Sequence, residues 1–234
     1  MSTGADTSAS PVVALLFKSI PPLLVIGFSL PFVFFFASAP FPHRLLGTTL
    51  FVATGAERVW AMYFRVRRKG LLEPRADWTA PAVGLAYMAV MYAVILEFYW
   101  RRTGIERAGL CVAGAVLYVA AVALRYWCLH LLGSQWAIHL DRASDEGTLI
   151  RTGPYRWIRH PLYLGACMEI VGIPLMLNAF LALPFGAVTF IPLEVQRAYY
   201  EERFLRATYG DLYADYVAET WAFLPLPFGK RRSR

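Results

Sequence analysis

The sequence is poor in charge and in cysteine. Of its 234 residues 17% are charged and 58% are hydrophobic, whereas about a quarter of the residues in a typical soluble domain are charged. The excess of apolar residues indicates that a lipid bilayer replaces water around much of the chain. The three cysteines, Cys111, Cys128 and Cys167, form no CxxC pair and no cysteine–histidine cluster with zinc spacing, so we expect small hydrophobes and no metal site.

Basic residues are missing from the start of the chain, because residues 1–10 are polar and contain no Lys or Arg. A cleaved signal peptide is therefore not expected. The net charge of +7 is concentrated elsewhere, in clusters beside apolar runs such as 65–69 and 230–234. Such clusters match anionic lipid headgroups and topology signals, so we expect membrane lipids and no nucleic acid as partners.

Several apolar runs are long enough to cross ~30 Å of hydrocarbon at about 1.5 Å per residue. They are residues 20–37, 45–64, 79–100, 108–132 and 162–192. The last run is too long for one span, and Pro174 and Asn178 near its middle predict a tight helical hairpin. The predicted fold class is therefore all-α, a polytopic membrane bundle of about six transmembrane helices.

Most of the Lys and Arg residues outside the spans fall on one side of such a bundle, in the loops 65–77 and 133–160 and in the C-terminal region. That side is predicted to be cytoplasmic, although the short loop with Arg101 and Arg107 runs against the rule. We expect an integral, multi-pass membrane protein.

The chain is predicted to have two parts. Residues 1–107 form N-terminal transmembrane helices with a possible substrate cleft, and residues 108–234 form a C-terminal core. Glu57 and Glu97 are charged residues within predicted spans, where charge is costly. They are expected to pair with neighbouring arginines or to help form the cleft.

The first polar cluster runs from Gly153 to Gly165 with the sequence GPYRWIRHPLYLG. The residue before a proline avoids the α region and proline suits the first helical turn, so His160 and Pro161 mark the start of a span. A helix N-terminus with Arg159 and His160 beside it predicts an anion site at the membrane surface. Gly165 would let a bulky group approach the backbone. The alternative is that Arg159 only anchors the helix among headgroups.

The second cluster lies on a charged helix predicted at 194–208. Arg197 and Glu201 are i,i+4 neighbours, which by itself predicts a solvated helix with ion pairs on its surface. Glu201 and Glu202 point in different directions, however, so one of them can turn inward. An inward carboxylate could bind ribose hydroxyls or an ammonium group and would favour a nearby sulfonium.

Together the two clusters resemble the isoprenylcysteine carboxyl methyltransferase family and its relatives, the phospholipid methyltransferases. The family pattern is G-x-Y-x-x-x-R-H-P-x-Y-x-G, a helical hairpin, and then R-x-x-x-E-E-x-x-L-x-x-x-[FY]-G-x-x-Y-x-x-Y. Every fixed position is matched between Gly153 and Tyr216. The resemblance is weaker at Arg125 and Leu132, and the first hundred residues show none.

The resemblance implies a membrane enzyme that holds S-adenosylmethionine in its C-terminal half, in a pocket open to the cytosol and to the bilayer for a lipid or prenylated substrate. The residues implied to bind the cofactor are Tyr155, Arg159, His160, Pro161, Tyr163, Gly165, Glu201 and Glu202. Arg197 and Arg125 are implied to act in catalysis by holding a substrate carboxylate.

Methyl transfer from a sulfonium is an in-line displacement, so catalysis consists mostly of positioning and desolvation. A carboxylate acceptor is already ionised and needs only an arginine fork, whereas an amine would need a base such as His160 or a glutamate. The arginines therefore favour carboxyl O-methylation of an isoprenylcysteine or a similar hydrophobic acid.

Three alternatives stay open. A phospholipid N-methyltransferase would use the same pocket. A lipid or sterol double-bond reductase with a nicotinamide cofactor shares the Arg-His-Pro-x-Tyr-x-Gly segment, but not the helix with Glu201 and Glu202. A non-enzymatic membrane protein such as a small transporter would leave the loop 133–160 and the segment 201–216 without a purpose.

Overall fold

The computed structural model describes residues 78–101, 107–133 and 149–224, with residues 49, 52 and 54–56. The chain forms two compact units, Met1–Trp78 and Thr79–Arg234, and every element discussed below belongs to the second. Some features predicted from the sequence lie outside the described residues: the span 20–37, most of the span 45–64 with Glu57, and the loop 65–77.

The described part of the second unit is helical. Its elements are α3 (Thr79–Arg101), α4 (Ala108–Leu132), the 3-10 turn η3 (Gly153–Arg156), α5 (Pro161–Met176), α6 (Ala182–Thr189), α7 (Ile191–Tyr209) and α8 (Asp211–Glu219). Among these residues there is one isolated β-bridge and no strand. The all-α class is confirmed, and the bounds of α4 are those predicted.

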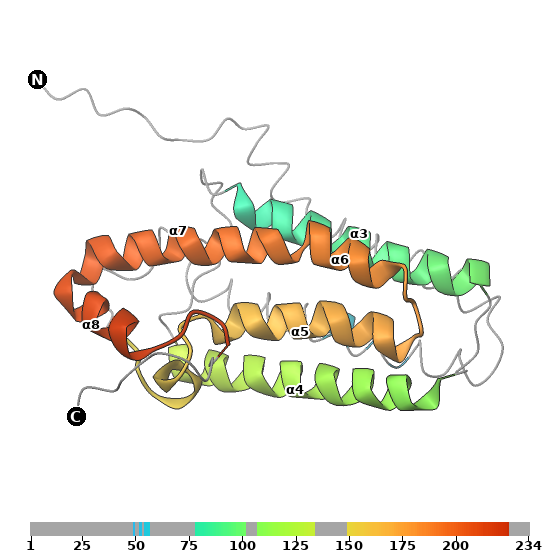
Figure 1. The fold of residues 1–234 in the computed structure, drawn as a ribbon, viewed down its shortest axis with the longest axis horizontal. Coiled ribbons are helices and arrows are strands. Elements are labelled where there is room, and N and C mark those ends of the chain that lie inside the picture. The colour runs from blue at the N-terminus through green and yellow to red at the C-terminus, as the bar shows by residue number, and fades with distance from the viewer. Residues whose placement is uncertain are drawn as a thin grey trace, which may run out of the picture. The chain divides into compact units, whose positions relative to one another are not determined.

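Helices α4 and α5 form a closely packed antiparallel pair (Figure 1). Small residues set their separation. A Cβ added to Gly114 would lie 2.4 Å from the backbone nitrogen of Met176 and 2.6 Å from the carbonyl oxygen of Gly172. Seven residues after Gly114 on α4 and seven residues before Gly172 on α5, the helices approach again. A Cβ on Gly165 would lie 3.3 Å from the carbonyl oxygen of Ala121. The two backbones thus approach closely, as is common between membrane helices.

The apolar stretch after His160 forms the predicted hairpin. Helix α5 ends at Met176 and α6 begins at Ala182. Between them Asn178 has a φ of 55°, a left-handed conformation that asparagine tolerates better than most residues. The prediction that Asn178 is the turn residue is confirmed.

Glu97 on α3 holds the second helix of this hairpin. Its Oε2 accepts hydrogen bonds from the backbone N–H groups of Leu181 and Ala182 at 2.8 and 2.9 Å, and Arg101 donates to its Oε1 at 3.1 Å. These N–H groups are the ones that a helix N-terminus leaves without an intrahelical partner. Glu97 therefore caps α6 and pairs with Arg101. Pairing with a neighbouring arginine was one of its two expected roles.

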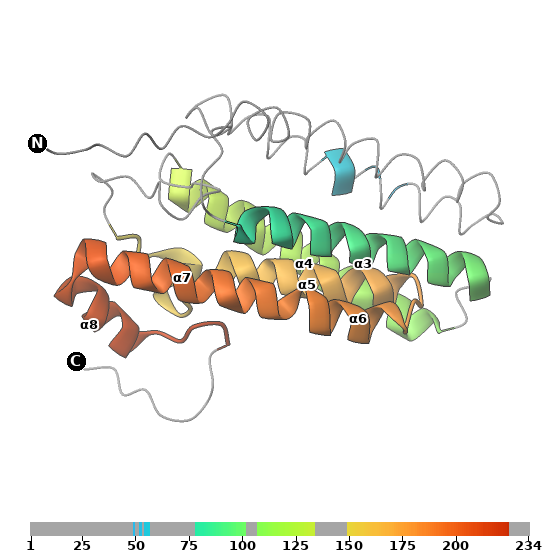
Figure 2. The same cartoon turned by 90° about the horizontal axis from the view of Figure 1, so that it is seen from above.

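Helices α6 and α7 follow nearly one line along α5, and from above α3 lies beside them (Figures 1 and 2). Pro192 in the first turn of α7 has no N–H to continue the hydrogen bonds of α6, so the helix is interrupted near Phe190. Gly210, with a φ of 52°, ends α7 and turns the chain into α8. Helix α8 leads back toward the start of α5 (Figure 1).

The surface of this unit suits lipid. Helix α4 is long and apolar enough to cross a membrane, and α3 and α5 contain shorter apolar segments, Ala82–Phe98 and Pro161–Met176. Large apolar side chains are exposed along α3, α4 and α6: Leu85, Leu96, Trp100, Val112, Val116, Val119, Phe185 and Val188. Apolar surface on this scale indicates an apolar environment or a partner. The number of spans stays a prediction.

Candidate functional site

The start of α5 places His160 against α7. Pro161 is the first residue of α5, and His160, with φ −120° and ψ 55°, precedes the helix as the sequence predicts. Its imidazole Nδ1 lies 3.5 Å from Oε2 of Glu201, and its Nε2 lies 3.1 Å from Oε1 of Glu202. We expected one of these glutamates to turn inward, but both converge on one imidazole.

The three groups stabilise each other's charged forms. Burial lowers the pKa of His160, but hydrogen bonds to Glu201 and Glu202 and their charges outweigh burial and raise it above 6.5. Burial raises the pKa of Glu202, yet bonds from His160 and Arg159 lower it to about 2. Burial likewise raises the pKa of Glu201, and the bond with His160 and its charge lower it overall. The cluster therefore favours an imidazolium between two carboxylates.

Arg159 links this cluster to the end of α8. Its Nε donates to Oε1 of Glu202 at 2.8 Å, and its Nη1 donates to the carbonyl oxygens of Thr220 and Val217. The side chain is 9% exposed. Arg159 thus contacts the protein interior, and its role is not limited to anchoring the helix among headgroups.

Residues 221–224, which we call the strap, run beside the residues that precede α5. The N–H groups of Arg159 and His160 donate to the carbonyl oxygens of Trp221 and Ala222 at 2.8 and 3.0 Å. In the opposite direction Trp221 donates to Trp157 at 3.1 Å, which completes a parallel β-bridge. These bonds hold the strap over the His160 cluster.

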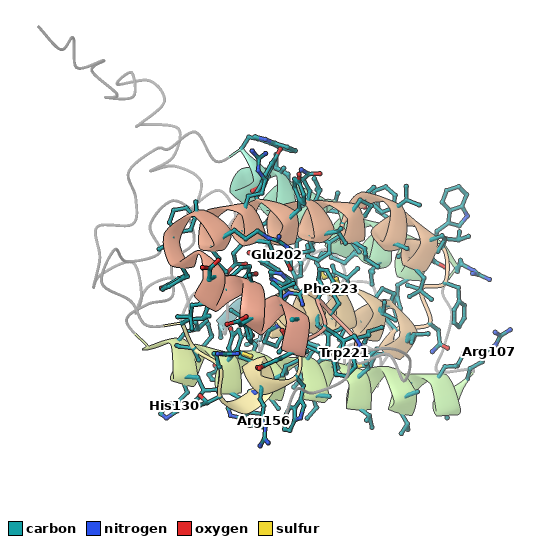
Figure 3. All side chains as sticks on the ribbon, turned by 60° about the vertical axis from the view of Figure 1, so that its left-hand side comes forward. Arg107, His130, Arg156, Glu202, Trp221 and Phe223 are labelled. Carbon is teal, nitrogen blue, oxygen red and sulfur yellow. The ribbon has the colours of Figure 1, made fainter. Side chains whose placement is uncertain are left out.

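Two aromatic rings lie beside the imidazole. The ring of Tyr163 stacks on it with centroids 5.6 Å apart, and Phe223 of the strap lies 5.5 Å away. In Figure 3, Glu202 and Phe223 lie between α7 and α5, while Arg156 and His130 lie at the edge. As a result His160 is 3% exposed, and the face of each ring favours its positive charge.

Arg197 lies one turn deeper on α7. Its guanidinium carbon is 6.0 Å from the ring centroid of Tyr163, and its Nη1 donates to Oγ1 of Thr79 on α3 at 3.0 Å. Tyr163 also forms a side-chain hydrogen bond with Glu201. Arg197 therefore belongs to the same interior layer as the residues predicted to bind the cofactor.

Arg125, the other predicted catalytic arginine, has a different environment. It forms a buried ion pair with Oε2 of Glu169 on α5, and the hydroxyl of Tyr87 on α3 donates to Oε1 at 2.7 Å. This triad joins three helices. Its geometry indicates a structural pair, and a contact of Arg125 with substrate stays a prediction.

Two further predicted residues contact α4. Gly165 packs against Ala121, so its missing side chain serves helix packing here. Tyr155 is buried, hydrogen-bonds Cys128 through its side chain, and accepts a hydrogen bond from the hydroxyl of Tyr216 at its carbonyl oxygen at 2.7 Å. Burial raises the pKa of the Tyr155 hydroxyl. The part of both residues in cofactor binding stays a prediction.

Tyr213 of α8 contributes a further buried polar group near the His160 cluster. Its side chain is fully buried, and among the described residues its hydroxyl has no hydrogen-bond partner. It lies close enough to Glu202 and Arg159 to interact electrostatically. A buried hydroxyl in this position calls for a water or a ligand atom.

The sequence reading missed Glu169, Glu194, Thr79 and Phe223. A signal existed for the first: Glu169 is a charged residue inside a predicted span, which is by itself a reason to expect a partner. No pattern pointed to Phe223, because its contact depends on how α8 returns the chain.

The family assignment comes from the segment that holds the cluster. Residues 114–207 match the sequence model of the isoprenylcysteine carboxyl methyltransferase (ICMT) family. This part of the chain is similar to that family. All ten predicted site residues lie within the ICMT segment, whereas α3 and the strap lie outside it.

Individual relatives match in part. Methanethiol S-methyltransferase of Mycobacterium tuberculosis is 40% identical over 73 residues, 31% of this chain and 29% of that protein. Protein-S-isoprenylcysteine O-methyltransferase of Tribolium castaneum is 27% identical over 131 residues, 55% of this chain and 43% of that protein. The chain thus spans less than half the length of either relative.

The fold is also shared with a solved structure, the eukaryotic intramembrane Ras methyltransferase ICMT. The TM-score is 0.64 at 18% identity, and the match covers 92% of this chain and 77% of the other. This likeness concerns the helical fold.

Proposed function

We propose that this chain transfers a methyl group from S-adenosylmethionine to a hydrophobic acceptor in the membrane, with the carboxylate of an isoprenylcysteine or similar acid as the nucleophile. The observation that carries the proposal is the convergence of Glu201, Glu202 and His160 inside the ICMT segment. The helix with both glutamates also separates this site from the nicotinamide-dependent alternative.

The residues around His160 suit such a cofactor. The Glu201 side chain is 36% exposed, so its carboxylate can accept hydrogen bonds from ribose hydroxyls or an ammonium group. Tyr213 supplies a buried hydroxyl, and Tyr163 and Phe223 supply aromatic surface. When bound, the cofactor supplies a methyl group activated by its sulfonium.

A carboxylate acceptor needs no general base, so the protein positions the acceptor and excludes water. Arg197 is the better placed of the two predicted arginines to hold the acceptor. Its guanidinium lies against the ring of Tyr163 next to the cluster, whereas Arg125 pairs with Glu169. Thr79 fixes one nitrogen of the guanidinium. A planar guanidinium fork of this kind can orient a carboxylate.

We also propose that the cluster faces the cytoplasm in a multi-pass protein. The support is the group of basic residues at this end of the helices, with Arg151, Arg156 and Arg206 outside the apolar segments. Positive residues are enriched on the cytoplasmic side of membrane proteins.

A second acceptor class is an apolar thiol. The observation in its favour is the relative from Mycobacterium tuberculosis, which is named for methanethiol and is 40% identical over the matched residues. A thiol would occupy the same position as the carboxylate but carries a proton at neutral pH.

Calorimetric titration of the detergent-purified protein with S-adenosylhomocysteine, beside NADPH, tests the proposal. We expect saturable binding of the first and none of the second. His160→Ala and Glu201→Gln should weaken that binding at least tenfold, because each removes a partner from the cluster. Asp215→Asn, which changes an exposed carboxylate on α8, should bind like the wild type.

Binding of NADPH alone would contradict the proposal and support a reductase. Normal binding of S-adenosylhomocysteine by both variants would instead show that the cofactor lies elsewhere.

A further inference from the structure

The two glutamates that meet His160 have different surroundings. Oε1 of Glu202 accepts a hydrogen bond from Nε of Arg159 at 2.8 Å and lies 3.1 Å from Nε2 of His160. Its Oε2 lies 3.6 Å from Nη2 of Arg206. The Glu202 side chain is 18% exposed, against 36% for Glu201. Protein groups thus face both oxygens of Glu202, and Glu201 is the glutamate with more surface left for a cofactor.

Arg159, which Glu202 anchors, also caps the C-terminus of α8. Its Nη1 donates to the carbonyl oxygens of Val217 and Thr220, which belong to the last turn and the C-cap of that helix. The last carbonyl groups of a helix have no intrahelical partner, and a cation is favourable beside them. One guanidinium therefore bridges a carboxylate on α7 and the end of α8.

The strap begins where Arg159 binds. Thr220 has the extended backbone angles φ −125° and ψ 156°, so the chain leaves α8 directly at the capped carbonyl group. The next carbonyl oxygen, that of Trp221, accepts from the N–H group of Arg159 at 2.8 Å. The carbonyl oxygen of Ala222 follows, with the N–H group of His160 at 3.0 Å. The side chain and the N–H group of Arg159 therefore fix consecutive residues at the start of the strap.

The contacts of Arg159 are directed into the protein. The sequence predicted an anion site at the start of α5, with Arg159 beside it. In the structure two N–H groups at this point donate to strap carbonyls, and the guanidinium, 9% exposed, donates to Glu202 and to the end of α8. What these contacts position is Phe223, whose ring centroid lies 5.5 Å from that of His160.

We propose that Arg159 is a positioning residue for the cofactor site that acts through the strap; the inference rests on the proposed function. Arg159 holds the strap against the start of α5, so that Phe223 stays beside the imidazole of His160. Without that contact the imidazole is open to water and the site loses aromatic surface. Arg159 itself does not contact the cofactor, in contrast to the role that the family resemblance implies for it.

Arg159→Lys separates the two contacts of the guanidinium. Lysine keeps a positive charge for Glu202, but its ammonium lacks the planar fork that bridges a carboxylate and two carbonyl groups. We expect Arg159→Lys to weaken S-adenosylhomocysteine binding at least tenfold in calorimetric titration of the detergent-purified protein. Phe223→Ala should weaken it to a similar extent. Arg203→Lys, which changes an exposed arginine of α7, should bind like the wild type.

The double variant Arg159→Lys/Phe223→Ala decides how Arg159 acts. If it acts through the strap, Arg159→Lys should weaken binding less than threefold once residue 223 is already alanine, because the two changes remove the same contact. If Arg159 touches the cofactor, the two losses should multiply, and that result would overturn the inference.

Hydrogen exchange gives a readout that needs no cofactor. The N–H groups of Arg159 and His160 donate to the strap, so their exchange with solvent reports whether the strap is in place. Mass spectrometry of the peptide that contains them should show at least tenfold faster exchange in Arg159→Lys. The amides inside α4 should keep their wild-type rates, which shows that the variant is folded.

Unchanged exchange at these two amides in Arg159→Lys would contradict the inference, as would wild-type affinity in that variant or in Phe223→Ala. The proposed function fails separately, if the wild type binds no S-adenosylhomocysteine. In that case the amide exchange still shows whether Arg159 holds the strap.

Discussion

At the scale of single residues, His160 determines the charge of the site. Its two ring nitrogens face Glu201 and Glu202, and the rings of Tyr163 and Phe223 lie beside it. The stability of this arrangement depends on pH in a direction that follows from the shifted pKa values.

The unfolding temperature should fall as pH rises above about 6.5. The folded protein binds the His160 proton more tightly than the unfolded chain, so its stabilisation is full below the ordinary pKa of 6.5 and disappears as pH rises through the raised value. Glu202 affects the stability of the fold at acid pH. Its stabilisation is full above its ordinary pKa near 4.5 and is lost as pH falls toward about 2.

Thermal unfolding of the detergent-solubilised protein between pH 6 and pH 9 measures the effect of His160, with wild type beside His160→Gln. The variant should show a smaller fall. His130→Gln changes an exposed histidine at the end of α4 and should keep the wild-type slope. An unchanged slope in His160→Gln would place the titrating group elsewhere.

At the scale of elements, the sequence predicts where helices begin and end better than which face of each helix meets its neighbour. Helix α4 has its predicted bounds, and His160 and Pro161 start α5, because apolar length and proline chemistry are local properties. Which side of α4 meets α5 depends on packing along the whole pair. The pairing of Arg125 with Glu169, 44 residues apart, could therefore not be read from either helix alone.

Two glycines of α4 test the contact between α4 and α5, because only one of them faces α5 closely. Gly114→Ala places a methyl group against backbone atoms of α5 at distances of 2.4 and 2.6 Å, so the helices must separate. Overpacking of this kind should destabilise the protein by about 1–3 kcal/mol. Gly109→Ala has nothing within 4 Å of the new methyl and should leave stability equal or slightly higher.

The midpoint of thermal unfolding in detergent distinguishes the two glycine variants. Equal midpoints would mean that the α4–α5 contact is looser than the structure shows. Since His160 directly precedes α5, Gly114→Ala should also weaken S-adenosylhomocysteine binding.

At the scale of the whole second unit, polar side chains connect the helices from the His160 cluster inward. The His160 cluster joins α5, α7 and the strap, Arg197 joins α7 to α3, and the Arg125 triad joins α3, α4 and α5. Composition and spacing located the first of these layers, since its residues lie in two compact motifs. The deeper layers depend on residues from separate helices, and only the folded chain brings them together.

The Arg125–Glu169 pair tests whether the deepest layer serves stability or the acceptor. Removing one partner leaves a buried charge uncompensated, so Arg125→Met or Glu169→Leu alone should destabilise by about 3–5 kcal/mol. Because the double variant removes both charges, it should recover most of that loss in thermal unfolding. Such a double-mutant cycle isolates the coupling between the two side chains.

The same double variant decides the role of Arg125. If the pair is structural, the folded double variant should methylate N-acetyl-S-farnesylcysteine with a KM near that of the wild type, since Arg197 is the residue proposed to hold the carboxylate. If Arg125 contacts the acceptor, the KM should rise at least tenfold while S-adenosylhomocysteine binding stays normal. The second result would return Arg125 to the catalytic role that the family resemblance implies, and would mean that Glu169 releases it when the acceptor binds.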